Sequence, residues 1–453
     1  MSDFLHFLWY FFLSLIGLSG NPANSGNGNT GNLYVSTRQP QYSYFNENLV
    51  NRFYILNQNN LYWFSRSRES VLRRQSFKNN LDSSNMLGLD KDKYNYQIIA
   101  GHINDLFLPE DSINAMQMDR IFTDVALKYG LDIYHGSEIA SWINIDEISP
   151  NFERNDESHI MKELLDVENG IDMNQYVRSL EPKDSTYGIL KTSLTKMIDS
   201  NDLQGVMKLS TSLNQYRWVH HFSLDKIIVV NIPSATLTYW ESDTIKLKMK
   251  VVLGKPSTRT PRFAAHCDKI ILFPYWNVPH KIAVNEFLPI FKKIPAMVTT
   301  MNMQILDSRG KIIPEDSIRW SRYSKNYFPF HIRQSTGCDN ALGVMKFNIT
   351  SPYDVYLHDT NLKSAFNSDH RYYSHGCIRL EKPFELANYL LSVPVDTTIL
   401  NSGLKDQNPT TIALPKPVPV FVIYMTAEAL ETGVRYYPDI YGLLQKPEIR
   451  SGL

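Results

Sequence analysis

The spacing of apolar residues along the chain changes partway, and this change predicts two kinds of structure. Over residues 40–216, apolar positions recur every three to four residues, which is the period of an amphipathic helix. Asp156 or Ser158 can cap one of these helices, and Gly170 is placed to end it. We therefore expect a helical domain over residues 40–216.

From residue 225 onward the apolar period becomes two, as in strands. Ile245, Leu247, Met249 and Val251 alternate with three lysines, so one face of this strand is buried and the other solvated. Residues 225–453 are therefore expected to form a β-rich domain, and the fold class of the chain is α+β.

The first residues have a different pattern again. Phe4–Leu18 is a fifteen-residue apolar run, which as a helix would extend roughly 22 Å, short of the ~30 Å hydrocarbon core of a membrane. Ser19–Asn32 is a polar, Gly/Asn-rich tether. Although Asp3 and the absence of Lys or Arg before the run depart from a standard signal peptide, residues 1–32 are interpreted as an export signal or short anchor followed by a tether.

Composition excludes several classes of protein. The chain has 46 basic and 46 acidic residues, so there is no electrostatic case for a nucleic-acid partner. Three cysteines cannot form a disulfide framework. Cys267 and Cys338 are expected to be small buried hydrophobes; only their number suggests that they pair.

The most informative motif is the run S-H-G-C-I-R-L around Cys377. A thiolate, not a thiol, is the nucleophile, and Cys377 has two nearby candidate bases in His358 and His375 and a cation in Arg379. Gly376 can bring the backbone close to a substrate and present N–H groups to an oxyanion. His375, next to glycine in a tight loop, is better suited to a structural hydrogen bond, so it is the less favoured base of the two, although it stays among the candidate catalytic residues.

A zinc site is the alternative interpretation of the same residues. His358, His370, His375 and Cys377 are separated by 12, 5 and 2 positions, whereas zinc sites usually contain close pairs such as C-x-x-C or H-x-x-x-H. We therefore expect no metal and no cofactor.

The H-D-T triplet at His358 and the run around Cys377 together resemble the active-site signature of the L,D-transpeptidases, which cross-link bacterial peptidoglycan. The resemblance extends to the helical region, which is similar to the scaffold domain of the long Gram-negative members. It also implies that residues 282–337 form a lid inserted in the catalytic domain. One departure is Cys338, where relatives commonly carry proline. The matching segments are Asn51–Tyr54, Ala126–Asp132, Leu180–Pro182, Val230–Pro233, Val252–Pro256, Pro274–Pro279, Asn340–Gly343 and Lys346–Phe347.

The resemblance also implies a mechanism. Cys377 would attack the carbonyl of the L-centre of diaminopimelate in a donor tetrapeptide and expel D-alanine, and an acceptor amine would resolve the thioester into a 3→3 cross-link. His358 would act as base, oriented by the backbone carbonyl of Asp359, because the Asp359 side chain diverges from its neighbour on a strand. The N–H groups of Gly376 and Cys377 would bind the oxyanion, and Arg379 would hold the loop or meet a substrate carboxylate.

Substrate-binding roles are expected for Tyr356, Asn340, Ser374 and Arg371. The implied partners are peptidoglycan stem peptides, donor and acceptor, and the implied location is the periplasm, with attachment to the inner membrane through residues 4–18 left open. A carbapenem should acylate such an enzyme.

Three interpretations remain in competition: the transpeptidase, an L,D-carboxypeptidase and a non-catalytic wall-binding protein. Water instead of an amine could resolve the same thioester, which would make the chain the carboxypeptidase. A non-catalytic wall-binding protein is disfavoured because Cys377, His358 and Arg379 are all present. A papain-like protease lacks its C-G-S-C-W context. Attachment of an outer-membrane protein to the wall is a further acceptor reaction.

Overall fold

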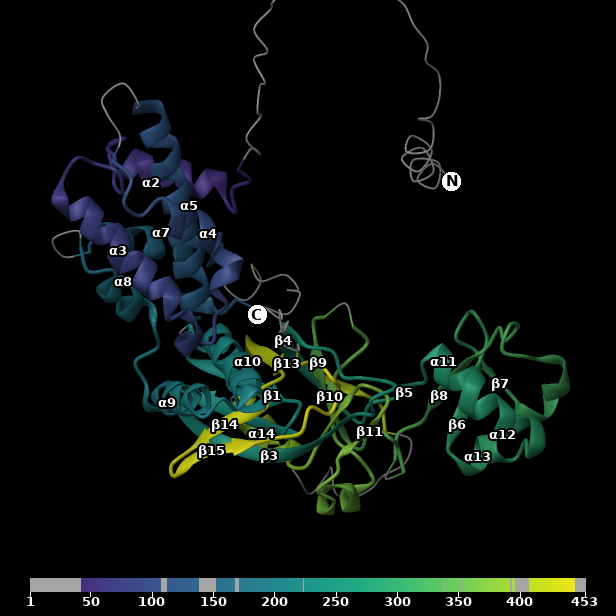
Figure 1. Cartoon of the computed structure of the whole chain (residues 1–453). Helices are drawn as coiled ribbons and strands as arrows, with labels where there is room; N and C mark the ends of the chain where they lie inside the picture. The colour runs from purple at the N-terminus through teal and green to yellow at the C-terminus, as the bar shows by residue number, and fades with distance from the viewer. Residues whose placement is uncertain are drawn as a thin grey trace, which may run out of the picture. The chain divides into compact units, whose positions relative to one another are not determined.

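The computed structural model (Figure 1) describes residues 42–106, 112–137, 152–167, 171–222, 224–337, 339–351, 353–391, 393–395 and 407–444. The apolar run Phe4–Leu18, the tether that follows it and Cys338 lie outside these residues. Within the described ranges, no helix has the length and apolar character needed to cross a bilayer.

The N-terminal helices pack around a core of their own. Asn46, Ser67 and Asp172 accept hydrogen bonds from the first turns of α2, α3 and α8, which are the side-chain caps that helix starts require. The buried core includes Phe53, Trp63 and twenty-five further residues between Leu49 and Leu180. The elements are α2 (Glu47–Leu56), α3 (Arg68–Asp82), η1 (Ser84–Leu87), η2 (Lys91–Tyr94), α4 (Tyr96–Gly101), α5 (Ser112–His135), α7 (Phe152–Leu165) and α8 (Met173–Leu180).

The last two helices of this region pack against the β-sheet as well as against other helices. α9 (Ser185–Asp199) and α10 (Leu203–His220) share a core with outward-facing residues of the β-sheet, such as Phe421 and Ile423. α9 and α10 therefore pack against the sheet on one side, while α10 also packs against α5 of the helical region. α10 also touches the helical region, where the Arg217 guanidinium donates to the carbonyl of Leu87 at 2.7 Å.

The β-rich domain is built on a nine-stranded sheet in the order β11-β3-β12-β10-β9-β4-β13-β1-β2. The long strand β3 pairs with β2 through its first half and with β12 and β11 through its second half, so the strands close into a ring. The strands are β1 (Lys226–Asn231), β2 (Thr236–Glu241), β3 (Thr244–Gly254), β4 (Phe263–Leu272), β9 (Met345–Ile349), β10 (Leu357–His358), β11 (Tyr372–Ser374), β12 (Ile378–Leu380) and β13 (Thr410–Ile423).

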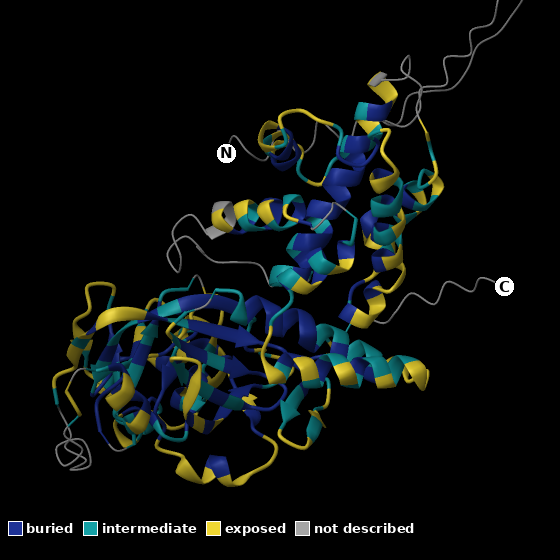
Figure 2. Ribbon diagram, turned by 90° about the vertical axis from the view of Figure 1, so that its left-hand side faces the viewer, coloured by how far each residue is buried: buried dark blue, intermediate teal, exposed yellow. Residues whose placement is uncertain are grey.

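The ring has an apolar interior, where Leu357, Phe347 and Ile378 pack with α14 (Pro383–Leu390). Figure 2 shows buried residues concentrated in the strands and on the inward faces of the helices. η8 (Lys363–Asn367) lies between β10 and β11, and a small hairpin of β14 (Ala427–Leu430) and β15 (Gly433–Tyr436) follows β13. The α+β fold class is confirmed, with a helical region followed by a β-rich domain.

The insertion predicted as a lid over residues 282–337 folds as a subdomain with its own core, which includes Phe291, Trp320 and Ile332. Its four strands are ordered β5-β8-β6-β7, and it is drawn apart from the nine-stranded sheet in Figure 1. Its elements are β5 (Trp276–Asn277), α11 (His280–Ile282), η5 (Ala283–Phe287, a π-helix), α12 (Leu288–Lys293), α13 (Met297–Thr300), β6 (Met303–Leu306), β7 (Ile312–Ile313), η6 (Glu315–Ser317), η7 (Trp320–Arg322) and β8 (His331–Gln334).

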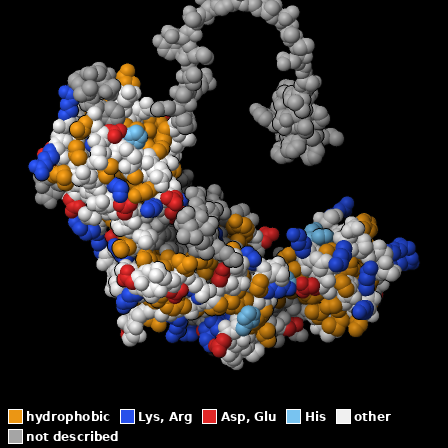
Figure 3. Space-filling model, viewed as in Figure 1, with side chains coloured by type: hydrophobic (Ala, Val, Ile, Leu, Met, Phe, Trp, Pro, Cys, Tyr) orange, Lys and Arg blue, Asp and Glu red, His pale blue; other side chains and the backbone are white. Residues whose placement is uncertain are grey.

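The lid carries an excess of positive charge. Residues 278–337 contain nine Lys and Arg but four Asp and Glu, although the whole chain is neutral. Figure 3 shows Lys and Arg side chains spread over the lid.

Candidate active site

The parallel pairing of β10 with β12 brings the predicted cysteine and histidine to one face of the sheet. Leu357 is the Cα partner of Ile378, and His358 is the partner of Arg379. Side chains alternate along a strand, so Tyr356, His358, Cys377 and Arg379 all lie on the same face. Leu357 and Ile378 point to the opposite face, into the core of the ring.

The surroundings of His358 leave one ring nitrogen available as a base. Its Nδ1 lies 2.5 Å from the backbone oxygen of Asp359, and because a carbonyl can only accept, Nδ1 carries the proton and Nε2 holds the lone pair. Burial, followed by the charge of Arg379, lowers the pKa of His358 to about 3. The imidazole is therefore neutral at pH 7.

The Asp359 carboxylate faces elsewhere. It accepts a hydrogen bond from the N–H of Val344 at 3.0 Å and pairs with Lys363. The orienting group of His358 is thus the Asp359 carbonyl, as expected from the divergence of adjacent side chains.

Cys377 is partly exposed and free, with its sulfur 3.6 Å from the carbonyl oxygen of Asp354. Burial raises the pKa of the Cys377 thiol, and hydrogen bonding to Tyr356 and the positive charges of Lys346 and Arg379 oppose that rise. The resting pair is a neutral thiol and a neutral imidazole, so the proton must move before the sulfur can attack.

The backbone of the nucleophile loop is held by Ser374. Its hydroxyl donates to the carbonyl of Cys377 at 2.7 Å and accepts the N–H of Gly376 at 3.1 Å. The expectation that both Gly376 and Cys377 offer free N–H groups is therefore not met. Of these two, only the N–H of Cys377 has no partner among the described residues.

Gly376 has φ +118°, a conformation that side-chain-bearing residues rarely adopt. A Cβ here would meet its nearest atom, the Arg259 oxygen, at 3.6 Å, so backbone conformation and not space requires glycine. Thr258 and Thr260 brace the same loop by donating to the carbonyls of Ser374 and Gly376 at 3.1 and 2.8 Å. No motif or spacing in the sequence points to these two threonines, which come from the segment after β3.

Three of the four predicted substrate-binding residues have polar groups that are already hydrogen bonded within the protein. Asn340 is fully buried and donates to the carbonyls of Pro274 and Ser335. Arg371 is buried and its guanidinium donates to four backbone carbonyls, including those of Ser234 and Ala235.

Ser374 is also buried, and its hydroxyl serves the loop as described above. Buried polar groups that are already paired cannot meet a substrate without losing those bonds. Tyr356 is the exception, because its hydrogen bond with Cys377 places it at the reacting sulfur.

Two further residues belong to this face and were missed as site residues. Lys346 on β9 is the Cα partner of His358, and its ammonium lies 3.9 Å from the centroid of the Tyr356 ring. Trp276 on β5 hydrogen bonds Tyr356. Lys346 belongs to a segment that carried the resemblance, but in the sequence it looks like any solvent-facing lysine of an alternating strand.

His375 makes the structural contact predicted for it, and its partner comes from the lid. Its Nε2 lies 2.7 Å from the Glu286 carboxylate, which belongs to η5. The nucleophile loop and the lid are therefore joined by a direct polar contact. Over the described ranges, no three His, Cys, Asp or Glu residues are gathered as a metal site would need.

Two other features lie away from this face. Cys267 is free and fully buried, and burial raises its thiol pKa to about 12, which suits a small core residue.

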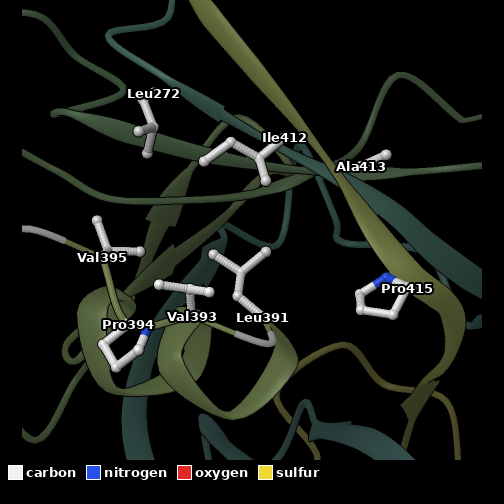
Figure 4. Close-up of a pocket in the computed structure, with 8 residues that line it drawn as sticks. All are labelled: Leu272, Leu391, Val393, Pro394, Val395, Ile412, Ala413 and Pro415. Carbon is white, nitrogen blue, oxygen red and sulfur yellow. The ribbon is translucent and has the colours of Figure 1, made fainter.

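An apolar pocket of about 360 Å³ is shown in Figure 4, and no nucleophile or titratable group lines it. Its lining residues are Leu272, Leu391, Val393, Pro394, Val395, Ile412, Ala413 and Pro415.

Comparison with known proteins finds matches to two known domains and to one related protein. The profile of the L,D-transpeptidase catalytic domain matches residues 225–420, and that of a Scaffold domain matches residues 48–194. A Haemophilus influenzae protein provisionally named an L,D-transpeptidase is 31% identical over 330 residues, which are 72% of this chain and 66% of that protein.

Solved structures give weaker similarities. An L,D-transpeptidase from Mycobacterium smegmatis is 17% identical, covers 44% of this chain and 58% of its own, and has a TM-score of 0.21. An L,D-transpeptidase in complex with imipenem is 18% identical, with 44% and 59% covered and a TM-score of 0.20. The chain spans less than two thirds of each of these relatives, and the TM-scores are too low to support an argument. The two profiles and the Haemophilus relative show that this chain belongs to the L,D-transpeptidase family and joins its catalytic domain to an N-terminal Scaffold domain.

Proposed function

We propose that the protein forms 3→3 cross-links between diaminopimelate residues of peptidoglycan stem peptides, through a thioester on Cys377. One observation carries this proposal: Cys377 and His358 lie on one face of the sheet, and the Asp359 carbonyl fixes the His358 proton on Nδ1. His358 Nε2 is then the atom that can take the thiol proton.

The first half-reaction follows from these atoms. The Cys377 sulfur transfers its proton to His358 and bonds to the carbonyl carbon of the L-centre of diaminopimelate in a donor tetrapeptide. The N–H of Cys377 is placed to donate to the oxyanion. When the bond to the terminal D-alanine breaks, the His358 imidazolium returns the proton to the leaving amine, and the acyl group remains on sulfur.

In the second half-reaction an acceptor attacks the thioester. The side-chain amine of a second diaminopimelate gives its proton to His358, bonds to the acyl carbon and expels the sulfur, which recovers a proton. Water in place of the amine would give an L,D-carboxypeptidase, and a protein amine would give attachment to the wall. The lid supports an acceptor other than water, because it contacts the nucleophile loop through Glu286 and its positive charge suits peptides rich in carboxylates.

The proposed substrates are found outside the cytoplasm, so the proposed location is the periplasm, with the Phe4–Leu18 run acting in export or anchoring. Recovery of the native protein only in the cytosolic fraction would contradict this location.

The test of the proposed function is acylation of Cys377. Intact mass spectrometry after incubation with imipenem should show a one-to-one adduct on wild type and on Cys267→Ala, whose buried thiol serves as the matched control. Cys377→Ala should form no adduct and should release no D-alanine from tetrapeptide muropeptides, while its thermal unfolding stays close to wild type. D-Alanine release above a few per cent of wild type in folded Cys377→Ala would overturn the assignment of the nucleophile.

A further inference from the structure

The position of Lys346 puts a cation beside the thiol. β9 and β10 run antiparallel, and Lys346 is the Cα partner of His358. Partners in register point to the same face, so the Lys346 side chain projects with Tyr356, His358 and Cys377. Its Nζ lies 3.9 Å from the centroid of the Tyr356 ring, and Tyr356 hydrogen bonds Cys377.

This cation forms no ion pair with any carboxylate among the described residues. Among the same described residues, Arg379 forms none either. Both side chains are half-buried. Withdrawing a cation from water without a partner costs free energy. An anion that forms next to two such cations lowers this cost, so the face is suited to a reaction in which a negative charge develops.

The other charged and titratable groups around the thiol do not remove this excess. β10 contributes the neutral His358, Tyr356 lies just before that strand, and β4 contributes a further cation, Lys269. The Asp354 carboxylate raises the pKa of Lys346 less than Cys377 does, and burial, the largest effect, lowers it. His375 and Glu286 are paired with each other across the lid contact.

We propose that Lys346 supplies a fixed positive charge that stabilises the anionic sulfur of Cys377. Arg379 acts on the sulfur from the neighbouring strand, so the sulfur is flanked by a cation on each side of β10. The same two charges oppose protonation of His358. Lys346 therefore favours the sulfur anion while discouraging His358 from retaining the proton, which suits a base that must pass the proton on to a leaving amine.

This proposal rests on Cys377 being the nucleophile of the proposed function, but its test needs no peptidoglycan. The rate of alkylation of Cys377 by iodoacetamide is measured against pH in the full chain, and the site of labelling is checked by peptide mass spectrometry. Lys346→Met keeps the length of the side chain and removes its charge. We expect the midpoint of the profile to rise by about one pH unit, which is a tenfold slower reaction at pH 7.

Two variants separate charge from packing. Lys346→Arg keeps the cation and should keep the wild-type midpoint. Lys269→Met removes a lysine from the adjacent strand whose charge does not act directly on Cys377, and it should also leave the midpoint unchanged. Should Lys346→Met unfold, which circular dichroism would reveal, Lys346→Gln takes its place with the same expectation.

Two outcomes would overturn the proposal. One is an unchanged midpoint in a folded, uncharged variant at position 346. The other is an equal shift in Lys346→Met and Lys346→Arg, which would assign the effect to packing on Tyr356. A shift of the midpoint together with failed transpeptidation by wild type would uphold the role of Lys346 and reject the proposed function, so the two failures are distinguishable.

Discussion

At the scale of single residues, His358 couples the proposed chemistry to stability. The unfolded chain binds a proton at this residue near pH 6.5, whereas the folded chain excludes it until about pH 3. The unfolded state therefore binds more protons between these values, and the free energy of unfolding must fall as the pH falls through that window. His221, whose pKa burial also lowers to about 3, adds to the same slope.

We predict that His358→Gln makes urea unfolding less dependent on pH between 7 and 4.5 than it is in wild type. His375→Gln, which changes a partly exposed histidine, is the matched control and should keep the wild-type slope. A slope in His358→Gln equal to that of wild type would show that burial of this ring does not exclude the proton.

The same two variants, His358→Gln and His375→Gln, test which histidine is the base and which makes only a structural contact. His358→Gln should slow acylation of Cys377 at pH 7 by a factor on the order of 10² to 10⁴, because it removes the ring nitrogen proposed to take the thiol proton. His375→Gln should change it little. The rate of imipenem acylation, followed by mass spectrometry against pH, checks this, and a displaced profile in His375→Gln alone would exchange the two roles.

Individual residues of the site show what the sequence could predict and what it could not. The sequence singled out Cys377 and His358 as a candidate thiol and base, and the register of β10 with β12 puts both on one face of the sheet. Asn340, Arg371 and Ser374 were assigned to substrate because a motif shows that a position matters, not whether its side chain turns inward to bind backbone. Lys346 could be recognised only through its register opposite His358, which the sequence does not contain.

At the scale of elements, the contact between His375 and Glu286 joins the nucleophile loop to η5 of the lid. Both side chains are well exposed, at 36% and 49%, so the pair contributes at most about 1 kcal/mol. That is too little to hold the fold together, but it is enough to shift the balance between two positions of the lid by up to about fivefold.

We predict that Glu286→Gln lowers the ratio of cross-linked to hydrolysed product by up to about fivefold, without lowering the thermal unfolding temperature appreciably. Glu315→Gln is the control, since Glu315 is a lid carboxylate that contacts Thr299 and not the loop. Muropeptide analysis gives both products in one assay. The double variant Glu286→Gln, His375→Gln should be no worse than either single variant, and fully additive losses would mean that the two side chains act separately.

Periodicity located the elements well but could not say what each one packs against. A 3.6-residue period shows that a helix has a buried face, and α9 and α10 have such a face whether it meets other helices or a sheet. The lid was predictable as an insertion between matched segments. The structure bounds it by the antiparallel β5–β8 pairing, in which Asn277 is the Cα partner of Arg333 and the N–H of Val278 donates to the carbonyl of Ile332 at 2.9 Å.

At the scale of the whole molecule, that pairing gives a clean place to remove the lid. Replacing residues 278–332 by Asn-Gly would close β5 and β8 as a two-residue hairpin and would leave the nine-stranded sheet and its core intact. We predict a folded protein that still forms the imipenem adduct but gives mainly hydrolysed product, because the thioester is no longer shielded from water. An unchanged ratio of dimer to hydrolysed product would place the acceptor site elsewhere.

The packing of α9 and α10 on the sheet also bears on where this enzyme can be shortened. A chain beginning at residue 225, where the match to the catalytic domain starts, would leave Ala264, Phe421 and Ile423 facing water, because the helices that cover them would be gone. An apolar surface of that kind promotes aggregation. The smallest soluble piece that carries Cys377 should therefore start before Asp184, the cap of α9, so the catalytic unit is about forty residues longer than the family match suggests.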